Sequence, residues 1–506
     1  MDPEKPDFSQ REDLRKPDLE EIGEREGYVL NDVSLAHERG LKTTADGQII
    51  LIPQPSDSPN DPLNWTPFHK HLVLIIISCT AFLPDYGSAT GAVTLTPQGE
   101  EWNMNPNVVN HSQVGNVFML GAAGPIVVAL SAYFGRYSIL FWWMLFALAT
   151  AIWCAGAQSF ESFMYQAARI LNGFFSTVAQ SGGLMFIKDM FFLHEHARKI
   201  NIWSGFIILS PYMGPLLGSF IVNTQIWQWA FGVYAIETGL CLIAIILFVD
   251  ETYYDRKTVQ PELVPNGPRW QRMLGIQQVR TKYIKNSFKD ACMRPVTMLR
   301  KPVIVLIVIA YMLMFAWVVG INTTLSIFLA PKYGFGAKAI VAAIIGEITG
   351  HWLHDFIAKT YAKRNNNHLD PEARLYAIWF AMPFLVPGLV LVGFALERHY
   401  HYMLAALGWG LYVFGIMIVT VAVNSYVLDA YPEASGEVAA WVNFGRTTGG
   451  FIVSYFMIEW AEKEGTIKQF GTMCGIVGAA FFIVVALQVW GKGLRAWSGP
   501  ARFKTA

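Results

Sequence analysis

Hydrophobic residues occur along the chain in long runs that short polar segments interrupt. A helix needs about 20 apolar residues to cross the roughly 30 Å of hydrocarbon in a bilayer, and twelve runs have about that length. They lie at residues 69–94, 113–132, 138–157, 162–187, 199–222, 228–249, 303–329, 337–358, 373–396, 402–427, 435–460 and 469–491. A longer polar stretch divides them into two blocks of six. The pattern therefore predicts two six-helix bundles.

Polar segments also flank the hydrophobic part of the chain. The first of them is rich in Asp, Glu, Lys and Pro and has no apolar core of the kind found in a cleavable signal peptide, which favours a disordered tail. We expect five parts, namely a disordered cytosolic tail (1–66), a first bundle (67–249), a cytosolic central loop (250–302), a second bundle (303–491) and a cytosolic C-terminal tail (492–506).

Composition also favours a membrane protein. Of the 506 residues, 53% are hydrophobic and only 15% are charged, whereas soluble domains average about 25% charged residues. The five cysteines are far apart and none has a metal-binding spacing, so we expect reduced thiols, no metal and no cofactor. The sequence contains no nucleotide-binding, zinc-protease or serine-hydrolase motif, and we expect no nucleic-acid partner. The expected class is an all-α membrane protein that is not an enzyme.

Lys and Arg residues predict the orientation of the chain in the membrane. The central stretch 250–301 holds 11 bases against 5 acids, whereas the loops at 95–112, 158–161 and 223–227 contain no Lys or Arg. Basic loops stay on the cytosolic side. We therefore expect both termini and the central loop in the cytosol, with the protein in the cell membrane or, alternatively, in the vacuolar membrane.

One glycosylation sequon, Asn110-His111-Ser112, falls in the first loop that we expect on the outside. Asn110 is therefore a candidate for N-linked glycosylation, and a chance occurrence close to the membrane is the alternative. A second sequon begins at Asn322 inside the seventh span, where we expect no modification.

Two short motifs lie inside neighbouring spans. Arg169 and Gly173 are one turn apart in span four, and span five contains Gly214, Pro215 and Gly218. An arginine in a membrane span is costly and usually faces protein or water, whereas glycines let helices pack closely and proline permits a bend. This combination suits a moving transport pathway better than a passive anchor.

The motifs and their order resemble those of the major facilitator superfamily. Arg169-x-x-x-Gly173 resembles the fourth-helix motif of that family, Gly214-Pro215-x-x-Gly218 its antiporter signature, and Asp250-Glu251-Thr252 the end of its sixth helix. The lead-in PNDPLNW and the segment Ser435 to Gly450 are similar to a fungal group in the drug:proton antiporter branch. The resemblance covers about residues 60–495 and implies twelve helices in two pseudo-symmetric six-helix bundles.

One loop departs from the pattern of that family. Between spans two and three the family carries an acidic residue and a neighbouring arginine, which help to latch the two halves together on the cytosolic side. This chain keeps Gly135 and Arg136 of the motif, but Ala132 and Tyr133 replace the acid and the arginine. The resemblance therefore implies a weaker latch or a different partner.

Charged residues inside the spans are the first candidates for coupling to protons. We interpret Asp85 in span one as a protonatable or cation-binding group opposite Arg169, with a helix cap as the alternative. Arg169 would favour the charged form of Asp85, and a structural ion pair is the alternative. We interpret Arg446 in span eleven as a packing and interdomain contact, and we assign no role to Glu237 or Glu459.

Span eight contains acidic and histidine residues on one helical stripe. Glu347, His351 and Asp355 are four residues apart in turn, which places them on the same face. Three interpretations remain open, namely an interfacial cluster in which Asp355 meets Lys359, a proton relay that uses the near-neutral titration of His351, and a metal site.

The substrate cavity is expected between the two bundles. In the fold of the family, spans one, four, seven and ten line this cavity, and here they carry amides and aromatics that suit a flat organic molecule. The candidates, for which ordinary helix packing is the alternative, are Asn172, Gln180, Trp317, Asn322, Trp409, Tyr412 and Asn424.

These observations predict a monomeric secondary transporter that uses protons to move a small organic molecule across a lipid bilayer by alternating access. The resemblance implies export of a drug-like compound or a secondary metabolite, but Ser210 and Ser219 dilute the antiporter signature and leave the direction open. The alternative within transport is uptake of a small organic cation such as a polyamine. The alternative outside transport is a sensor on the same scaffold.

Overall fold

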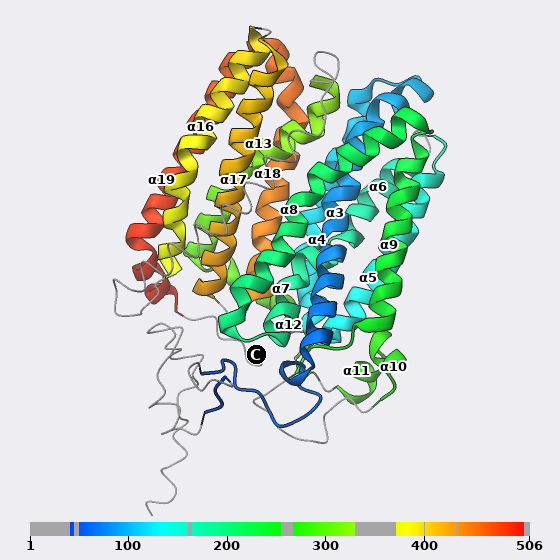
Figure 1. Cartoon of the computed structure of the whole chain (residues 1–506), viewed down its shortest axis with the longest axis vertical. Coiled ribbons are helices and arrows are strands. Elements are labelled where there is room, and N and C mark those ends of the chain that lie inside the picture. The colour runs from blue at the N-terminus through cyan, green and yellow to red at the C-terminus, as the bar shows by residue number, and fades with distance from the viewer. Residues whose placement is uncertain are drawn as a thin grey trace, which may run out of the picture.

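The chain folds into two groups of long helices that lie side by side (Figure 1). The computed structural model describes residues 41–44, 50–159, 164–254, 267–328, 371–431 and 434–499, apart from residues 283, 285 and 399.

The first group, which we call the first half, contains α3 (Pro67–Glu101), α4 (Pro106–Phe134), α5 (Arg136–Gly156), α6 (Met164–Ser176), α7 (Val178–Met190), α8 (Leu193–Thr224) and α9 (Gln228–Phe248). The second half contains α13 (Pro302–Phe328), η4 (Pro371–Leu375), α16 (Tyr376–Glu397), α17 (Tyr402–Ala430), α18 (Ser435–Glu464) and α19 (Thr466–Ser498). Three short helices lie between the halves in sequence, namely α10 (Arg269–Met273), α11 (Ile276–Thr281) and α12 (Phe288–Met298).

The helices follow the expected membrane spans closely. In the described part of the chain, ten helices are long and apolar enough to cross a membrane. The 30-residue helix α18, which is the expected span eleven, is not among these ten because it is more polar. Span four is divided at Thr177, between α6 and α7. The expected span eight, 337–358, lies outside the described residues.

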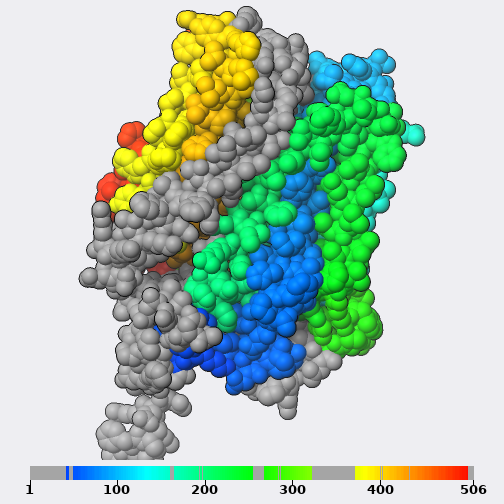
Figure 2. Space-filling model, in the orientation of Figure 1, coloured from blue at the N-terminus to red at the C-terminus, as the bar shows by residue number. Residues whose placement is uncertain are grey.

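Each half has a buried hydrophobic core, and each core includes a few residues of the other half, such as Tyr212 of α8 and Ala439 of α18. In the first half α3 packs against α8 and α9, and in the second half α16 packs against α17 and α19. Figure 2 shows α3, α8 and α9, coloured blue to green, next to one another on one face of the first half. The main contact between the halves is made by α18, which packs along α13 in its own half and along α4 in the other.

The glycine motif of α8 allows that helix to approach α3. A Cβ atom on Gly214 would lie 2.7 Å from the carbonyl oxygen of Tyr86 and 2.9 Å from the amide nitrogen of Thr90. Real Cβ atoms do not come this close to backbone, so a side chain at residue 214 would push the two helices apart. Pro215 follows within the same helix.

One end of the molecule holds the start of α3, the end of α19 and the short helices α10 to α12 (Figure 1, lower end), and we call it the terminal face. Ordered structure at this face begins before α3. The segment 50–66, which the sequence assigns to the tail, contains the 3₁₀ helix η2 (Pro62–Asn64), whose first turn Asp61 caps by accepting the Leu63 amide at 3.0 Å. Lys70 of α3 donates to the Leu63 carbonyl at 2.7 Å and so fastens the segment to the first half.

Candidate functional site

A cavity lies between the two halves. Helices α3, α4, α7 and α8 line it from the first half, and α13, α17 and α18 line it from the second. Most of the lining is apolar or aromatic. The polar and charged side chains are Asp85, Ser88, Gln113, Gln180, Ser204, Thr420, Asn424, Asn443, Arg446 and Thr447. An apolar cavity with a few polar groups is the usual form of a small-molecule site.

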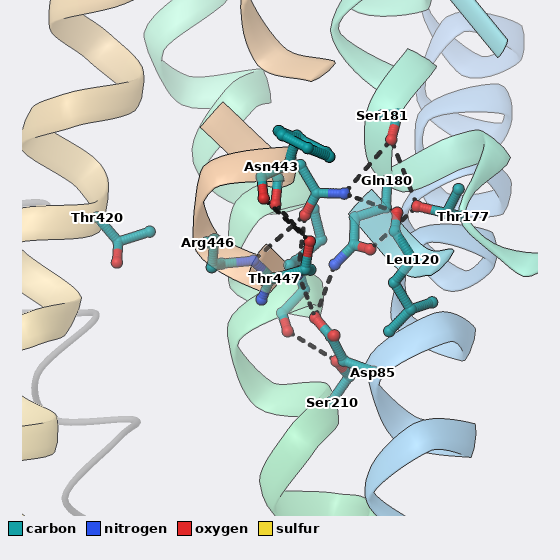
Figure 3. Close-up of polar contacts among 12 residues, drawn as sticks. Asp85, Leu120, Thr177, Gln180, Ser181, Ser210, Thr420, Asn443, Arg446 and Thr447 are labelled. Carbon is teal, nitrogen blue, oxygen red and sulfur yellow. Dashed lines mark hydrogen bonds and ion pairs between the residues drawn. The ribbon is translucent and has the colours of Figure 1, made fainter. Parts of the chain in front are cut away.

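An ion pair crosses this cavity from one half to the other. Arg446 of α18 donates through Nη2 to the Asp85 carboxylate of α3 at 2.9 Å, and Gln180 of α7 donates to the same carboxylate oxygen at 2.7 Å (Figure 3). The side chains of Asp85 and Arg446 are only 11% and 9% exposed. Breaking a buried pair by neutralising one partner typically costs about 3–5 kcal/mol, because the other charge stays uncompensated.

Neighbouring groups fix the position of Arg446. Asn443, one turn earlier in α18, accepts hydrogen bonds from Nε of Arg446 at 3.2 Å and from Nη2 at 2.9 Å. The amide of Asn443 in turn donates to the Leu120 carbonyl of α4 at 3.2 Å. The guanidinium carbon lies 5.3 Å from the ring centroid of Phe315 in α13. Arg446 is therefore held by groups from three helices and aimed at α3.

Helix α3 continues through Pro84 without a break, so Asp85 is part of a continuous helix. A helix cap, the alternative for Asp85, would require a helix to begin or end there, and α3 does neither. The sequence shows Asp85 and Arg446 as charges inside spans, but it does not show that they meet. They are 361 residues apart, and their contact requires α18 to pack against the first half.

The hydrogen bonds of Arg169 go to backbone and side-chain groups near Asp85 and not to the Asp85 carboxylate. The Arg169 side chain is fully buried, and it donates to the Gly87 carbonyl at 3.1 Å, to the Ser88 carbonyl at 3.3 Å and to the Gln113 side chain. The Phe231 ring lies 5.0 Å away. Arg169 is not among the residues that line the cavity. Its contacts tie α6 to α3 and α4 by hydrogen bonds, whereas the structural alternative for this residue was an ion pair.

The other pathway candidates fall into three groups. Asn424 lines the cavity. Asn172, Trp317 and Tyr412 are buried outside it, with Asn172 donating to α5 and the Tyr412 hydroxyl donating to α13. Asn322 belongs to α13, but its side chain lies outside what the structure describes. The stripe of Glu347, His351 and Asp355 in span eight also lies outside the described residues.

Asn110, expected in a loop, lies inside α4 and is 4% exposed. A buried helical side chain is not a favourable acceptor for glycosylation. Gly173 in α6 serves close packing, since a Cβ there would lie 2.4 Å from the Asn116 carbonyl oxygen of α4. Gly218 in α8 likewise lies against α3, where a Cβ on residue 218 would come within 2.8 Å of the Val93 side chain.

Arg136, from the loop between spans two and three, makes its contacts inside the first half. Its guanidinium pairs with Asp189 at the end of α7. Glu251, which follows α9, accepts the backbone amides of Arg136 at 3.1 Å and of Tyr137 at 3.2 Å, and so caps α5. Burial raises the pKa of Glu251, although these amides and Arg136 act in the opposite direction.

Helix α12 of the central loop adds a contact between the halves at the terminal face. Arg294 of α12 pairs with Glu437 in the first turn of α18 at 3.4 Å. Trp441 of α18 donates to the Pro295 carbonyl of α12 at 2.9 Å. These groups attach the central loop to the second half.

The same part of the central loop also contacts α4 in the first half. Asn286 donates to the Ala132 carbonyl at 2.9 Å, and the Phe288 ring lies 5.4 Å from the ring of Tyr133. Ala132 and Tyr133 are the residues that replace the acid and the arginine of the loop motif. The central loop therefore contacts the two residues for which the resemblance implied a weaker latch or a different partner.

Comparisons with known proteins agree with this architecture. The profile of the Major Facilitator Superfamily matches residues 75–454. Relatives include the efflux pump radE of Floropilus chiversii, 26% identical over 460 residues that cover 87% of this chain and 84% of the relative. An uncharacterized MFS-type transporter of Schizosaccharomyces pombe is 24% identical over 555 residues, which cover 93% of this chain and 92% of the relative.

Solved structures show the same fold at low identity. The xylose transporter XylE from E. coli superposes with a TM-score of 0.58 at 15% identity, over 83% of this chain and 99% of that chain. The human organic anion transporter MFSD10 superposes with a TM-score of 0.56 at 17% identity, over 83% of this chain and 100% of that chain.

Proposed function

Because the chain belongs to the Major Facilitator Superfamily, a family of transporters, we propose that it is a proton-coupled secondary transporter of a small organic molecule. The chain is a multi-pass membrane transporter and not an enzyme. The cavity between the halves supports the view that substrate binds there while the two halves rock against each other. The observation that carries the proposal is the ion pair of Asp85 and Arg446, which joins α3 to α18 across this cavity.

We propose that Asp85 carries the coupling proton. Among the lining residues that the structure describes, Asp85 is the one carboxylate. When it is charged, its attraction to Arg446 holds α3 and α18 together across the cavity. Protonation removes that attraction and so favours a different arrangement of the halves. The proton thus acts on the equilibrium between conformations, as a coupling ion must.

We propose export as the direction, with the terminal face in the cytosol and a drug-like compound or secondary metabolite as the substrate. The names of two relatives support this, since radE and FUB11 of Gibberella fujikuroi are both described as efflux pumps. Uptake of an organic cation such as a polyamine needs an available carboxylate, whereas Asp85 is already paired with Arg446.

Transport in proteoliposomes tests the proposal. Three probes cover the substrate classes, namely rhodamine 6G, spermidine and naphthalene-1-sulfonate. Each is followed in two assays, accumulation driven by an imposed pH gradient and counterflow, in which labelled probe exchanges for unlabelled probe. We expect wild-type protein to perform both with at least one probe. Asp85→Asn should lose accumulation but keep counterflow, because exchange needs no net proton movement.

Two outcomes contradict the proposal. If Asp85→Asn accumulates a probe as strongly as the wild type under the same pH gradient, Asp85 is not the coupling group. If wild-type protein binds a probe but shows neither accumulation nor counterflow, the chain is a sensor on a transporter scaffold.

A further inference from the structure

Among the residues that the structure describes, the Asp85 carboxylate is the counter-ion of Arg446, and it serves as one only while it is charged. The Arg446 guanidinium is buried at the cavity wall, and the Asp85 carboxylate is the acidic group paired with it. The proposed transport cycle protonates Asp85 and so leaves this cation without a partner. A buried charge without a partner is strongly disfavoured, so the protonated state has a vacancy for a negative group.

We propose that the transported molecule is an organic anion and that Arg446 binds its negative group when Asp85 is protonated. This inference rests on the proposed proton coupling at Asp85. The anion replaces the lost carboxylate charge, while the apolar and aromatic lining holds the carbon skeleton. Proton and anion then occupy the cavity together and cross the membrane in the same direction. Export by this route therefore follows the outward gradient of the anion itself, and an inward proton gradient does not drive it.

The surroundings of Arg446 suit this role. Asn443 holds two of its nitrogen atoms, and the ring of Phe315 lies against the guanidinium, so the group stays in place when Asp85 is neutral. An arginine fixed in this way is the preferred partner for a carboxylate or sulfonate, because its planar donors match those oxygens. Arg446 is thus organised as an anion site before any anion arrives.

A second donor lies in the same cavity. The Tyr212 hydroxyl is buried at the lining, and among the described residues it has no hydrogen-bond partner. Buried hydroxyls are normally satisfied, so an unsatisfied one in a ligand cavity indicates a group that the ligand fills. Tyr212 belongs to α8 in the first half, whereas Arg446 belongs to α18 in the second, so the cavity offers an anion donors from both halves.

Among the described residues, two charged groups outside the cavity lie near this part of α3. They are Arg169 of α6, which contacts the Gly87 and Ser88 carbonyls, and Glu237 of α9, which acts electrostatically on Tyr86. In the described lining the titratable groups besides Asp85 are Arg446 from α18, Tyr212 from α8 and Tyr311 from α13, while α7 and α4 contribute the amides of Gln180 and Gln113. Tyrosine hydroxyls stay neutral between about pH 5 and pH 8. A change in anion binding over this range that depends on both Asp85 and Arg446 therefore reports on the pair.

Organic cations fit the site less well. A positive group near protonated Asp85 would stand beside the unpaired Arg446, and like charges repel in a low-dielectric cavity. When Asp85 is charged, a cation must compete with Arg446 for the same carboxylate. In both protonation states the site therefore disfavours a positive ligand relative to a negative one.

Three probes with one ring system and fixed charges test the proposal. They are naphthalene-1-sulfonate, naphthalene-1-methanol and (naphthalen-1-ylmethyl)trimethylammonium, and calorimetry measures their binding to the full-length protein in detergent at pH 5 and pH 8. The charge of each probe does not change with pH, so any pH dependence comes from the protein. We expect the sulfonate alone to bind more tightly at pH 5, by about tenfold, which is within the usual range of coupled binding events.

Linkage supplies a second readout on the same samples. If protonation of Asp85 tightens sulfonate binding, sulfonate binding must cause proton uptake by the same coupling. A pH indicator in weak buffer measures this uptake. We expect it with the sulfonate and not with the alcohol.

Variants assign the effect to the pair. Asp85→Asn should bind the sulfonate tightly at both pH values, because residue 85 is then always neutral. Arg446→Gln should lose the sulfonate preference, and Arg446→Lys should keep part of it. The double variant Asp85→Asn with Arg446→Gln has no buried charge to destabilise it and should show neither preference nor pH dependence. Lys289→Gln, which removes an exposed positive charge on α12, is the control for net charge and should match the wild type.

Binding of the uncharged alcohol shows that each variant is folded. The inference is overturned if the trimethylammonium probe binds more tightly than the sulfonate at pH 5, or if Arg446→Gln binds the alcohol normally and keeps its preference for the sulfonate. Neither result touches the proposed proton coupling, because accumulation and counterflow with Asp85→Asn decide that question separately.

Discussion

At the scale of single residues, the ion pair of Asp85 and Arg446 stabilises a contact between the halves and, in the proposed mechanism, also responds to the coupling proton. The two charges are buried together, so each is stabilised by the other. Any process that neutralises Asp85 must supply a replacement for it or move Arg446. This is why a proton, which is small and can reach a buried carboxylate, is able to shift the relation between two large helix bundles.

The pair should show strong coupling in a double-mutant cycle. Asp85→Asn and Arg446→Gln should each destabilise the protein by about 3–5 kcal/mol, because each leaves one buried charge alone. The double variant should lose much less than the sum of the two. Unfolding of purified protein in detergent, followed by intrinsic fluorescence, measures these changes. Additive losses would mean that the two side chains do not interact.

Glu251 predicts a pH-dependent stability that involves no transport. Burial raises its pKa above that of the unfolded chain, so folding takes up a proton between the two values. This contribution to stability is present at low pH and is lost as the pH rises through the raised pKa. The melting temperature of the wild type should therefore fall more steeply between about pH 4 and pH 8 than that of Glu251→Gln.

Loss of a cap hydrogen bond to the Arg136 or Tyr137 amide should also lower the melting temperature of Glu251→Gln by an amount that does not depend on pH. The change of melting temperature with pH therefore reports on the titration of Glu251, and the constant difference between the two proteins does not. Parallel curves for the two proteins would show that Glu251 does not titrate between these pH values.

The residues of the site were only partly predictable from the sequence. Asp85 stands out because a carboxylate in an apolar run is costly, and this signal is local. Arg446 carries the same signal, but its partner depends on how α18 meets the first half, which no local pattern encodes. For Arg169 the sequence shows the charge but not its partners. Its hydrogen bonds go to backbone carbonyls of α3, and a sequence does not show which carbonyls will accept them.

At the scale of elements, the sequence predicted the helices whose apolar residues are numerous enough to cross the hydrocarbon of a membrane. Backbone groups in hydrocarbon must bond within their own helix, so long apolar runs have no alternative structure. The division of span four at Thr177 and the helix α12 were not predictable in this way. Both depend on contacts made after the spans have packed, and α12 is a short amphipathic segment inside a polar loop.

Close packing of α8 on α3 gives a matched pair of glycine substitutions. Gly214→Ala should destabilise the protein by about 1–3 kcal/mol, because the new Cβ overlaps the backbone of α3. Gly205→Ala in the same helix should be neutral or stabilising by up to about 1 kcal/mol, since nothing lies within 4 Å of that position. Thermal unfolding of both variants provides the comparison. Equal effects would rule out close approach at Gly214.

The attachment of α12 to α18 predicts a second element-level effect. Arg294→Gln should lower stability by about 1–3 kcal/mol, because it leaves Glu437 buried without its partner. Exchanging the two charges, with Arg294→Glu and Glu437→Arg together, should recover only part of this, since a helix N-terminus disfavours a positive residue. Lys289→Gln on the exposed side of α12 should have no effect. A full loss in the exchanged variant would argue against a direct contact.

At the scale of the whole molecule, two separately packed halves meet along α4 and α18 and enclose a cavity. Most of each hydrophobic core lies within one half, although Ile208 and Tyr212 of α8 pack with the core of the second half and Ala439 of α18 packs with that of the first. Near the cavity centre, polar contacts cross this boundary, among them the ion pair of Asp85 and Arg446 and the hydrogen bond from Asn443 to the Leu120 carbonyl. A change in one protonation state at this point acts on the relation between the halves, and this is the basis of the proposed mechanism.

Infrared difference spectroscopy tests this account most directly. Spectra of the purified transporter at pH 5 and pH 8 reveal which carboxyl groups gain a proton, through the carbonyl band of a protonated carboxylic acid. The account predicts that Asp85→Asn loses a component of this band that Glu459→Gln, which alters an exposed acid of α18, retains. The component of Glu251, whose pKa burial raises, should be present in both variants. A band that is unchanged in Asp85→Asn would contradict the account, because another carboxyl group would then carry the proton.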